Sequence, residues 1–442
     1  MIYTSVQSLI KVSFIKETID KKQKKFYYKI KLMNRRVENM IIREIYMKQI
    51  RDYMNTLVIK VITGMRRSGK SALLELTRDE LKHNGVPDEN IIYINFESLR
   101  FAELKKNMTL YTHITELSKD VKGKIYILLD EIQEVDDWEK IINSFRVDLN
   151  CDIYITGSNA KLLSGELATL LAGRYVEIHV FPLSFSEYIE FSKNDENENN
   201  KSIEKLFADY IKYGGLPGIH QLKWDENAVM QYLEDIYNSV ILKDVIQRNN
   251  IRDTALLESI IHYLMDNIGN TFSAKTISDF LKSQGRRLSV ETVYNYIEAL
   301  QSAFIINKVR RFDIKGKRIL ETQEKYYMSD LGLRHAVMGY RDNDISGILE
   351  NVVYQELLRR GYKVCIGKQG VAEVDFVAEN KEDRIYIQVC YVLHDGDIER
   401  EFAPLEAIAD NYEKIVISTD SLISFNHNGI KQKNIIDFLL SK

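Results

Sequence analysis

The stretch of sequence from Leu57 to Leu76 decides the fold of this chain. It reads LVIKVITGMRRSGKSALLEL, an apolar run followed by a glycine-flanked turn and a second apolar pattern. The turn matches G-x-x-x-x-G-K-[ST], in which glycines let backbone N–H groups approach phosphate oxygens. The flanks predict a buried parallel strand over 57–63 and a helix from Ser71, whose N-terminus favours anions. We therefore expect a nucleotide site on a strand–loop–helix unit.

The residues of this loop are predicted to contact a bound nucleotide. Lys70 is expected to reach the β- and γ-phosphates, and Ser71 is expected to offer its hydroxyl to Mg²⁺. A glycine-rich turn with an incidental lysine is the alternative, which the flanking strand and helix disfavour. The candidate binding residues are Gly64, Met65, Arg66, Arg67, Ser68, Gly69, Lys70, Ser71 and Ala72, with Ser158 further along the chain.

A later apolar run ends in two carboxylates. Residues 125–131 read IYILLDE. Asp130 is expected to hold Mg²⁺, directly or through its water ligands, and Glu131 to polarise the water that attacks the γ-phosphate. Two acids that end a strand are more often a solvated turn. Behind a phosphate-binding loop, however, the pair favours Mg²⁺-dependent hydrolysis of ATP.

The end of the next apolar run and a later arginine give weaker signals. Residues 153–159 read IYITGSN, and adjacent strands would bring Ser158 or Asn159 near the γ-phosphate, where a side chain can orient the attacking water. A plain turn explains these residues equally well. Arg174 precedes another predicted strand. It is a candidate arginine finger for its own or a neighbouring site, and a surface ion pair is the competing interpretation.

Strands and helical patterns alternate through the first half of the chain. The predicted strands are 57–63, 91–96, 125–129, 153–157 and 175–180. This alternation predicts an α/β fold in which a mostly parallel P-loop NTPase sheet has helices on both faces.

The composition is that of an ordinary globular protein. The chain has 442 residues, 45% apolar residues and a net charge of −3, so binding to nucleic acid would need a local basic patch. Cys151, Cys365 and Cys390 form neither a disulfide framework nor a zinc pattern, which favours a reducing, cytoplasmic location. No apolar stretch is long enough for a transmembrane helix, and no membrane partner is expected.

Several motifs occur together in the order of one large prokaryotic family. Besides 64–71 they are LDEIQ at 129–133, TGSN at 156–159, AGR at 172–174 with FPLSF at 181–185, and GGLP at 214–217. In these motifs the chain resembles AAA-type ATPases that carry a C-terminal domain of unknown function related to the PD-(D/E)XK nuclease fold. The resemblance implies an AAA+-like core, a winged-helix domain and a nuclease-like tail. It also supports Ser158 and Asn159 as the sensor position and Arg174 as the candidate arginine finger.

Residues 273–301 have the pattern of a helix–turn–helix, with Ser273 and Ser289 as N-caps. In a winged helix the second helix would enter the DNA major groove, and the ribbon that follows would contact phosphates. The second helix carries Glu291 and Glu298 and little positive charge. Packing on the ATPase core or on a partner is therefore an equally supported interpretation. The basic residues of the ribbon are Lys308, Arg310, Arg311, Lys315, Lys317 and Arg318.

The C-terminal part places polar residues in the order helix, strand, strand. Glu350 lies in a helical pattern, Asp375 in a strand-like run, and Gln388 and Cys390 in the next run. PD-(D/E)XK chemistry needs carboxylates on Mg²⁺ and a lysine that orients water. Gln388 stands where an acid is needed and Cys390 where the lysine is needed, and neither replaces the lost group. We expect a nuclease-like fold without nuclease activity.

These patterns divide the chain into segments. The predicted segments are a basic extension without a packed core (1–39), the ATPase core (40–192), a loop with a helical lid (193–250), a winged-helix domain (251–340) and a small nuclease-like α/β domain (341–442).

The sequence predicts an ATP hydrolase that uses ATP and Mg²⁺ and couples hydrolysis to domain rearrangement, with DNA as a candidate partner. The candidate catalytic residues are Lys70, Glu131, Asn159 and Arg174, and the candidate metal ligands are Ser71 and Asp130. Two other hypotheses stay open: a nucleotide-gated regulator that binds DNA or protein with little turnover, and a DNA-processing nuclease–ATPase. If Arg174 acts in trans, the active form is a homo-oligomer.

Overall fold

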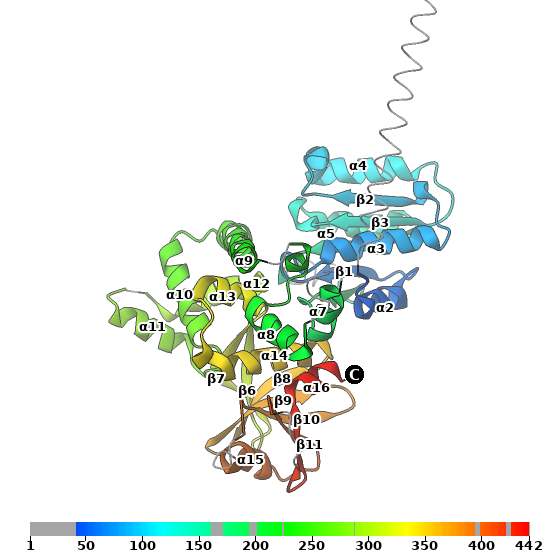
Figure 1. The fold of residues 1–442 in the computed structure, drawn as a ribbon. Helices are drawn as coiled ribbons and strands as arrows, with labels where there is room; N and C mark the ends of the chain where they lie inside the picture. The colour runs from blue at the N-terminus through cyan, green and yellow to red at the C-terminus, as the bar shows by residue number, and fades with distance from the viewer. Residues whose placement is uncertain are drawn as a thin grey trace, which may run out of the picture.

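The computed structural model describes residues 41–160, 171–193, 201–222, 225–286, 288–393, 398–420 and 426–441. The predicted N-terminal extension, residues 1–39, lies outside these described residues. Figure 1 shows a body built on a parallel sheet, followed by a second body of helices and strands. None of the described helices has the length and apolar character needed to cross a membrane.

A five-stranded sheet forms the first body. Its strands run in the order β2-β3-β4-β1-β5, and every neighbouring pair is parallel. The strands are β1 (Ile59–Thr63), β2 (Ile91–Asn95), β3 (Ile125–Asp130), β4 (Cys151–Gly157) and β5 (Tyr175–His179). The predicted α/β fold with a parallel sheet is confirmed.

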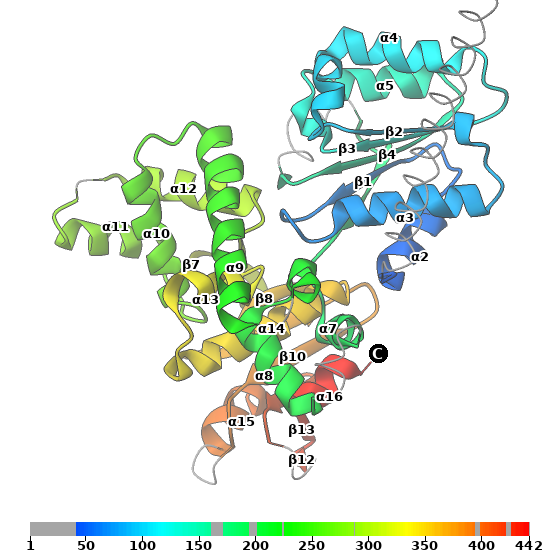
Figure 2. The same cartoon turned by 45° about the horizontal axis from the view of Figure 1, so that its top comes forward.

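Helices cover both faces of this sheet, as Figures 1 and 2 show. The helices α2 (Glu44–Tyr53) and α3 (Lys70–His83) lie on one face, and α4 (Asn107–Ser118) and α5 (Trp138–Asp148) lie on the other. Successive side chains of a strand point to opposite faces. In β3, Leu128 packs in the cluster of α3, whereas Ile127 packs in the cluster of α5. Burial on both faces explains why the strand sequences are continuously apolar.

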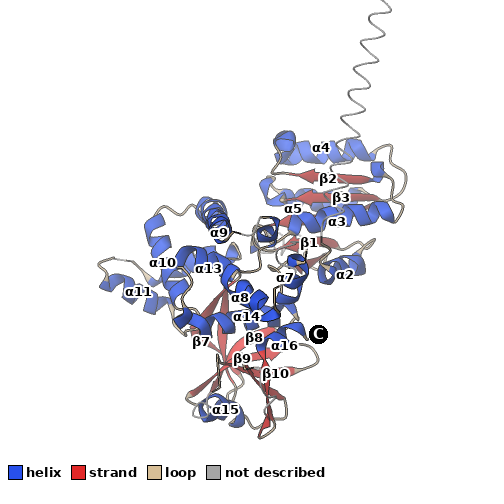
Figure 3. Ribbon diagram, in the orientation of Figure 1, coloured by secondary structure: helices blue, strands red, loops and turns tan. Residues whose placement is uncertain are grey.

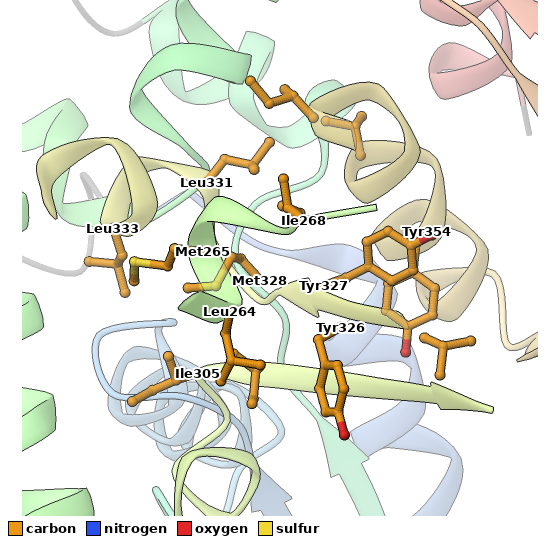
Figure 4. Close-up of a cluster of buried hydrophobic side chains, with 14 of the residues drawn as sticks. Leu264, Met265, Ile268, Ile305, Tyr326, Tyr327, Met328, Leu331, Leu333 and Tyr354 are labelled. Carbon is orange, nitrogen blue, oxygen red and sulfur yellow. The ribbon is translucent and has the colours of Figure 1, made fainter. Parts of the chain in front are cut away.

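The helices that follow pack around a single apolar core. They are α7 (Phe185–Ser192), α8 (Ile203–Tyr213), α9 (Glu226–Val240), α10 (Thr254–Asp266), α11 (Ala274–Ser283), α12 (Val290–Ser302) and α13 (Leu331–Met338). Figure 4 shows the part of this core where side chains of α10, α13 and α14 meet those of β7. The predicted caps form, because Ser273 and Ser289 accept hydrogen bonds from the backbone N–H groups of Thr276 and Thr292.

An eight-stranded mixed sheet completes the molecule, drawn as red arrows in Figure 3. Its order is β12-β13-β11-β10-β9-β8-β6-β7, with β6 parallel to β8. The strands are β6 (Ile306–Asp313), β7 (Arg318–Met328), β8 (Lys363–Gln369), β9 (Ala372–Glu379), β10 (Arg384–Val389), β11 (Glu413–Ser418), β12 (Asn426–His427) and β13 (Ile430–Asn434). The helices beside them are α14 (Ile345–Arg359), α15 (Ile398–Glu406) and α16 (Ile435–Leu440). The hairpin β6–β7 therefore shares a sheet with residues 363–434, across the predicted boundary at residue 340.

Candidate functional site

The phosphate-binding loop joins β1 to α3 at the carboxyl edge of the parallel sheet. Gly64 and Gly69 have φ angles of 138° and 104°, which L side chains rarely adopt. A Cβ atom on Gly64 would lie 2.3 Å from the carbonyl oxygen of Val180, so glycine alone fits there. The N-terminus of α3 opens onto the loop, where its unpaired N–H groups favour an anion.

Lys70 is held inside the loop. Its side chain is 3% exposed, and Nζ donates a hydrogen bond of 2.9 Å to the carbonyl oxygen of Met65. Burial lowers the pKa of Lys70, and the nearby carboxylates of Glu131 and Asp130 oppose that shift. The ammonium group is thus placed beside both acids that the sequence singled out.

Asp130 and Ser71, the two candidate metal ligands, lie in contact. The Ser71 hydroxyl donates to Oδ1 of Asp130 at 3.1 Å, and the Thr156 hydroxyl donates to the same oxygen at 2.5 Å. Asn95 donates from Nδ2 to Oδ2 of Asp130 at 2.7 Å. A hydroxyl beside a carboxylate is the ligand pair that Mg²⁺ takes next to nucleotide phosphates, so these residues fit the ion.

Asn95 and Thr156 hold this carboxylate although neither was a candidate site residue. Both stand at the carboxyl end of a strand, in β2 and β4, and these strands flank β3. Because the order of strands is not written in the sequence, only the structure shows that these ends meet. A search for polar residues at every strand end would have found them.

Glu131 directly follows β3 in a left-handed conformation, with φ of 57°. Its backbone N–H donates to the Thr156 hydroxyl at 2.9 Å, and its Oε2 accepts hydrogen bonds from Ser158 at 3.3 Å and from Gln133. Burial alone would raise the pKa of Glu131, but the positive charge of Lys70 and the hydrogen bond from Gln133 bring it below its ordinary value. The carboxylate is therefore ionised at neutral pH.

The end of the predicted strand 153–157 also reaches the site. Ser158 is buried, and its hydroxyl contacts Glu131 and also receives a hydrogen bond of 3.2 Å from Nη1 of Arg248. Asn159 follows it and is 7% exposed. The structure thus brings together the loop, the paired acids and the sensor-like strand end.

Arg174 does not join them. It precedes β5, whose first residue Tyr175 lies opposite Ile59, the first residue of the parallel strand β1. Arg174 therefore lies at the amino edge of the sheet, and Gly64 lies at the carboxyl edge. At about 3.3 Å per residue the two edges are roughly 16 Å apart, more than an arginine side chain spans. The expectation that Arg174 serves the site of its own chain is wrong, and a role in a neighbouring chain stays a prediction.

Two cavities lie over the loop. The first, of about 220 Å³, is lined by Lys70, Ser71 and Glu131 from the sheet body and by Pro217 and Tyr232 from the helical body. The second, of about 670 Å³, shares Arg66, Arg67, Glu97 and Glu131 with the first and adds Lys105, Glu134, Lys243, Gln247 and Arg248. The space beside the loop thus lies between the two bodies.

Arg248 and Asp244 are site residues that the sequence analysis missed. They come from the segment Ile241–Gln247 and the residue after it, which continue α9. Arg248 lies 2.7 Å from Asp244, and Asp244 lies 3.7 Å from Arg66 of the loop. No motif marks them in the sequence, because their place depends on how the helical body folds back onto the sheet.

The predicted nuclease-like residues surround a lysine. Nζ of Lys325, on β7, lies 2.9 Å from Glu350, 2.9 Å from Glu373 and 3.3 Å from Asp375. The Tyr327 hydroxyl donates to Glu350 at 2.8 Å. Burial would lower the pKa of Lys325, but the three carboxylates raise it above its ordinary value, so the group stays an ammonium ion.

These residues do not fit a metal ion, because the ammonium already lies between the carboxylates. Gln388 accepts a hydrogen bond from the backbone N–H of Asp375 at 3.3 Å, and Cys390 is buried in the apolar cluster of Phe402. The sequence pattern places the expected lysine at position 390, where Cys390 stands. The lysine instead comes from β7, which the pairing of distant strands brings to the cluster.

The basic hairpin has an exposed tip and a covered base. Lys315, Lys317 and Arg318 are exposed at the turn between β6 and β7. Lys308, at the base, pairs with Glu324 at 2.6 Å and lies over the ring of Tyr294. The tip is thus open to a large partner, and so is Arg310, an exposed residue of β6.

Comparison with known proteins supports the assignment of the sheet body as an AAA-type ATPase domain. Residues 57–189 match the family model of an AAA domain, and residues 204–344 match that of a domain of unknown function, DUF8612. A Walker-type ATPase of Pyrococcus abyssi has a similar structure, with a TM-score of 0.51 and 17% identity over 68% of this chain and 96% of that one. At that identity the likeness concerns the fold alone. These matches do not test the predicted winged-helix domain or the predicted nuclease-like domain, which stay predictions.

Relatives at higher identity cover nearly the whole chain. An uncharacterized protein of Haemophilus influenzae is 41% identical over 401 residues, which are 91% of this chain and 99% of the relative. An uncharacterized protein of Methanocaldococcus jannaschii is 32% identical over 86% of this chain and 85% of the relative. The chain belongs to the family that includes these relatives, and it carries an AAA-type P-loop ATPase domain.

Proposed function

We propose that this protein is an Mg²⁺-dependent ATPase that couples ATP binding and hydrolysis to movement between its two bodies. One observation carries the proposal. Lys70, Ser71 and Glu131 line a cavity whose opposite wall comes from the helical body, and Asp130 lies buried behind Ser71, to which it is hydrogen-bonded. A ligand that fills this cavity contacts both bodies, so its presence favours one arrangement of them.

The side chains divide the work of hydrolysis. Lys70 binds the β- and γ-phosphates, and Ser71 and Asp130 hold Mg²⁺, which neutralises phosphate charge when bound. Glu131 accepts a proton from the attacking water. Its Oε2 already accepts hydrogen bonds from Ser158 and Gln133, so Oε1 is the oxygen that we assign to this step. We assign Asn159 to orienting the same water.

Two arginines link the loop to the helical body. Nη1 of Arg43 donates to the carbonyl oxygens of Ser68, in the loop, at 3.0 Å and of Phe181 at 2.9 Å. From α14, Nη2 of Arg359 donates to the carbonyl oxygens of Pro182 at 3.3 Å and of Leu183 at 3.2 Å. The segment 181–183, which connects the two bodies, is thus hydrogen-bonded to Arg43 on one side and to Arg359 on the other. Through these bonds a shift of the phosphate-binding loop is transmitted to α14.

Phosphate release and nucleotide binding test the proposal together. We expect Lys70→Ala to lose ATP binding. Glu131→Gln should bind ATP and hydrolyse it about 10²–10⁴-fold more slowly, because a general base is lost while the shape is kept. Glu116→Gln, the same exchange at an exposed position on α4, is the matched control.

Normal turnover in Glu131→Gln would show that Glu131 is not the general base. Absence of phosphate release from the wild-type protein would favour the hypothesis of a nucleotide-gated regulator with little turnover. The assay is repeated over a range of protein concentrations. If Arg174 acts as a finger in a neighbouring chain, turnover per chain rises with concentration, and Arg174→Ala abolishes that rise.

A nucleotide-gated DNA-binding regulator is the second candidate function. In order along the chain, α10, α11, α12 and the hairpin β6–β7 follow one another as in a winged helix, and Phe272 pairs with Glu324 beside the hairpin. The exposed face of α12 carries Glu291 and Glu298. Phosphate contact is therefore assigned to the hairpin tip alone.

Binding of duplex DNA at several salt concentrations tests this assignment. Replacing Lys315, Lys317 and Arg318 by alanine should lower the slope of log K against log salt by about 2–3, because each lost phosphate contact removes about 0.9. Alanine at Lys48, Lys119 and Lys122, exposed on the ATPase body, makes the same charge change and is the control. An equal change of slope in both triple variants would mean that the hairpin tip makes no specific phosphate contact and that only the net charge of the protein matters.

Nuclease activity is not part of the proposal, because Lys325 occupies the centre of the acid cluster. A cytoplasmic location is part of it. Cys151, Cys365 and Cys390 are all free thiols, which suits a reducing compartment.

A further inference from the structure

The segment from Ile241 to Gln247 brings a buried acid and an arginine into the nucleotide site. It continues α9 as a π-helix, a rare wide turn that is frequently found at functional sites. Asp244 lies inside this segment and Arg248 directly follows it. Both belong to the helical body, yet both contact residues of the sheet body.

The two carboxylate oxygens of Asp244 have unequal surroundings. The residue is 1% exposed. Oδ1 lies 2.7 Å from Nη1 of Arg248 and 3.5 Å from the Ser158 hydroxyl. Oδ2 lies 3.7 Å from Nη1 of Arg66 and accepts no hydrogen bond from any residue that the structure describes. Because a buried oxygen without a hydrogen bond costs free energy, the attraction of nearby cations must hold this group in place.

The cations around Asp244 are of the kind that would bind the negative charge of a terminal phosphate. Arg66 belongs to the phosphate-binding loop, Arg248 also donates to Ser158, and Lys70 attracts the carboxylate electrostatically. The carboxylate balances this positive charge. A γ-phosphate has the same sign as the carboxylate, and two anions repel each other strongly where water is excluded.

We propose that Asp244 stands in for the γ-phosphate and so makes the site discriminate between ATP and ADP. This inference rests on the proposed function. A γ-phosphate beside Lys70 takes Arg66 and Arg248 from Asp244, and the carboxylate moves away together with its π-helical segment. ADP lacks that group and leaves the contact intact.

The movement has a defined route into the helical body. Segment 241–247 is continuous with α9, and α12 packs against it. Helix α9 in turn packs against α13. Displacement of Asp244 therefore reaches α12, the helix that directly precedes the hairpin β6–β7 of the second candidate function.

Asp244→Asn tests the inference, because it removes the charge and keeps the shape. Binding of the Mg²⁺ complexes of the non-hydrolysable analogue AMPPNP and of ADP is measured by calorimetry on the full chain. We expect AMPPNP to bind about tenfold more tightly than to the wild type, and the affinity for ADP to stay within about twofold. Asp235→Asn, exposed on α9, should change neither. Weaker binding of AMPPNP, or an equal change for both nucleotides, overturns the inference.

Hydrogen–deuterium exchange on the wild type gives a second test that needs no variant. AMPPNP should raise the exchange of residues 241–247 above the level seen with ADP, and equal exchange in both states overturns the inference. If the wild type binds neither nucleotide, the proposed function fails and takes this inference with it. If it binds both and Asp244→Asn leaves their ratio unchanged, only this inference fails.

Discussion

Asp130 and Glu131 are neighbours in the chain with opposite pKa shifts. Burial raises the pKa of Asp130 to about 6, against the hydrogen bonds from Thr156 and Ser71. Burial acts on Glu131 in the same direction, but the charge of Lys70 and the bond from Gln133 outweigh it and lower its pKa. Adjacent acids with pKa values pushed apart are suited to different tasks. This difference supports the assignment of Asp130 to the metal and of Glu131 to the proton.

The raised pKa of Asp130 predicts a pH dependence of the Mg²⁺ effect on ATP binding. A proton competes with Mg²⁺ for this carboxylate, and the proton is bound below a pH of about 6. The gain in ATP affinity on adding Mg²⁺ should therefore be present at pH 7.5 and fall by about tenfold per pH unit below 6. Titration of ATP with and without Mg²⁺ between pH 5 and 8 measures this. Asp130→Asn should show a small Mg²⁺ effect that does not vary with pH, and a wild-type effect that persists at pH 5 would contradict the assignment.

At the scale of elements, the loop depends on the strand beside it. β5 ends at His179, and the carbonyl oxygen of the next residue, Val180, lies against Gly64. The N–H of Val180 in turn donates to the carbonyl oxygen of Thr63 at 2.8 Å. The close approach of these two backbones shapes the loop, and it requires a residue without a side chain.

Gly64→Ala tests this contact, and Gly85→Ala is its matched control. Both glycines have a positive φ, but a Cβ atom on Gly85 would meet nothing within 4 Å. The control should lose about 1–2 kcal/mol of unfolding free energy from backbone strain alone. Gly64→Ala should lose a further ~1–3 kcal/mol, because the Val180 carbonyl must move, and should also lose ATP binding. Urea unfolding and nucleotide titration measure the two effects. Equal losses in both variants would mean that the contact with Val180 carries no cost.

At the scale of the whole molecule, the acid cluster joins two parts of the chain. Lys325 comes from the hairpin at one edge of the eight-stranded sheet, whereas Glu350 comes from α14 and Asp375 from β9. Thr271, in the turn before α11, donates to Glu373 at 2.9 Å. The cluster thus fastens the helical middle to the C-terminal strands and acts as a structural joint.

Lys325→Met should destabilise the second body strongly. Removing one partner of a buried ion pair leaves uncompensated carboxylates, at a cost of about 3–5 kcal/mol in urea unfolding. Lys363→Met, at an exposed position on β8, should cost less than about 1 kcal/mol. Adding Glu350→Gln to Lys325→Met should recover part of the loss, because it removes one of the buried acids that has lost its lysine partner.

The same cluster gives a test of the misfit to metal. With the ATPase site disabled by Asp130→Asn, millimolar Mg²⁺ or Mn²⁺ should leave the melting temperature unchanged, since the ammonium of Lys325 occupies the cluster. A clear rise in melting temperature would show that the ions compete with the lysine, and would reopen the nuclease hypothesis.

Local pattern was sufficient for the loop, the strand ends and the caps. The glycines and lysine of the loop act over a few residues, apolar runs mark strands buried on both faces, and Ser273 and Ser289 cap the helices that follow them. Such features depend on neighbours in the chain. They can therefore be predicted from the sequence whatever tertiary fold the rest of the chain adopts.

Only the folded chain decided which distant residues meet. The strand order put Asn95 and Thr156 on Asp130 and moved Arg174 to the far edge of the sheet. The return of α9 onto the sheet body brought Asp244 and Arg248 to the loop, and the joining of the hairpin to the C-terminal strands brought Lys325 to the acid cluster. The physical reason is the same in each case: these contacts arise from the packing of whole elements, which spacing along the chain does not encode.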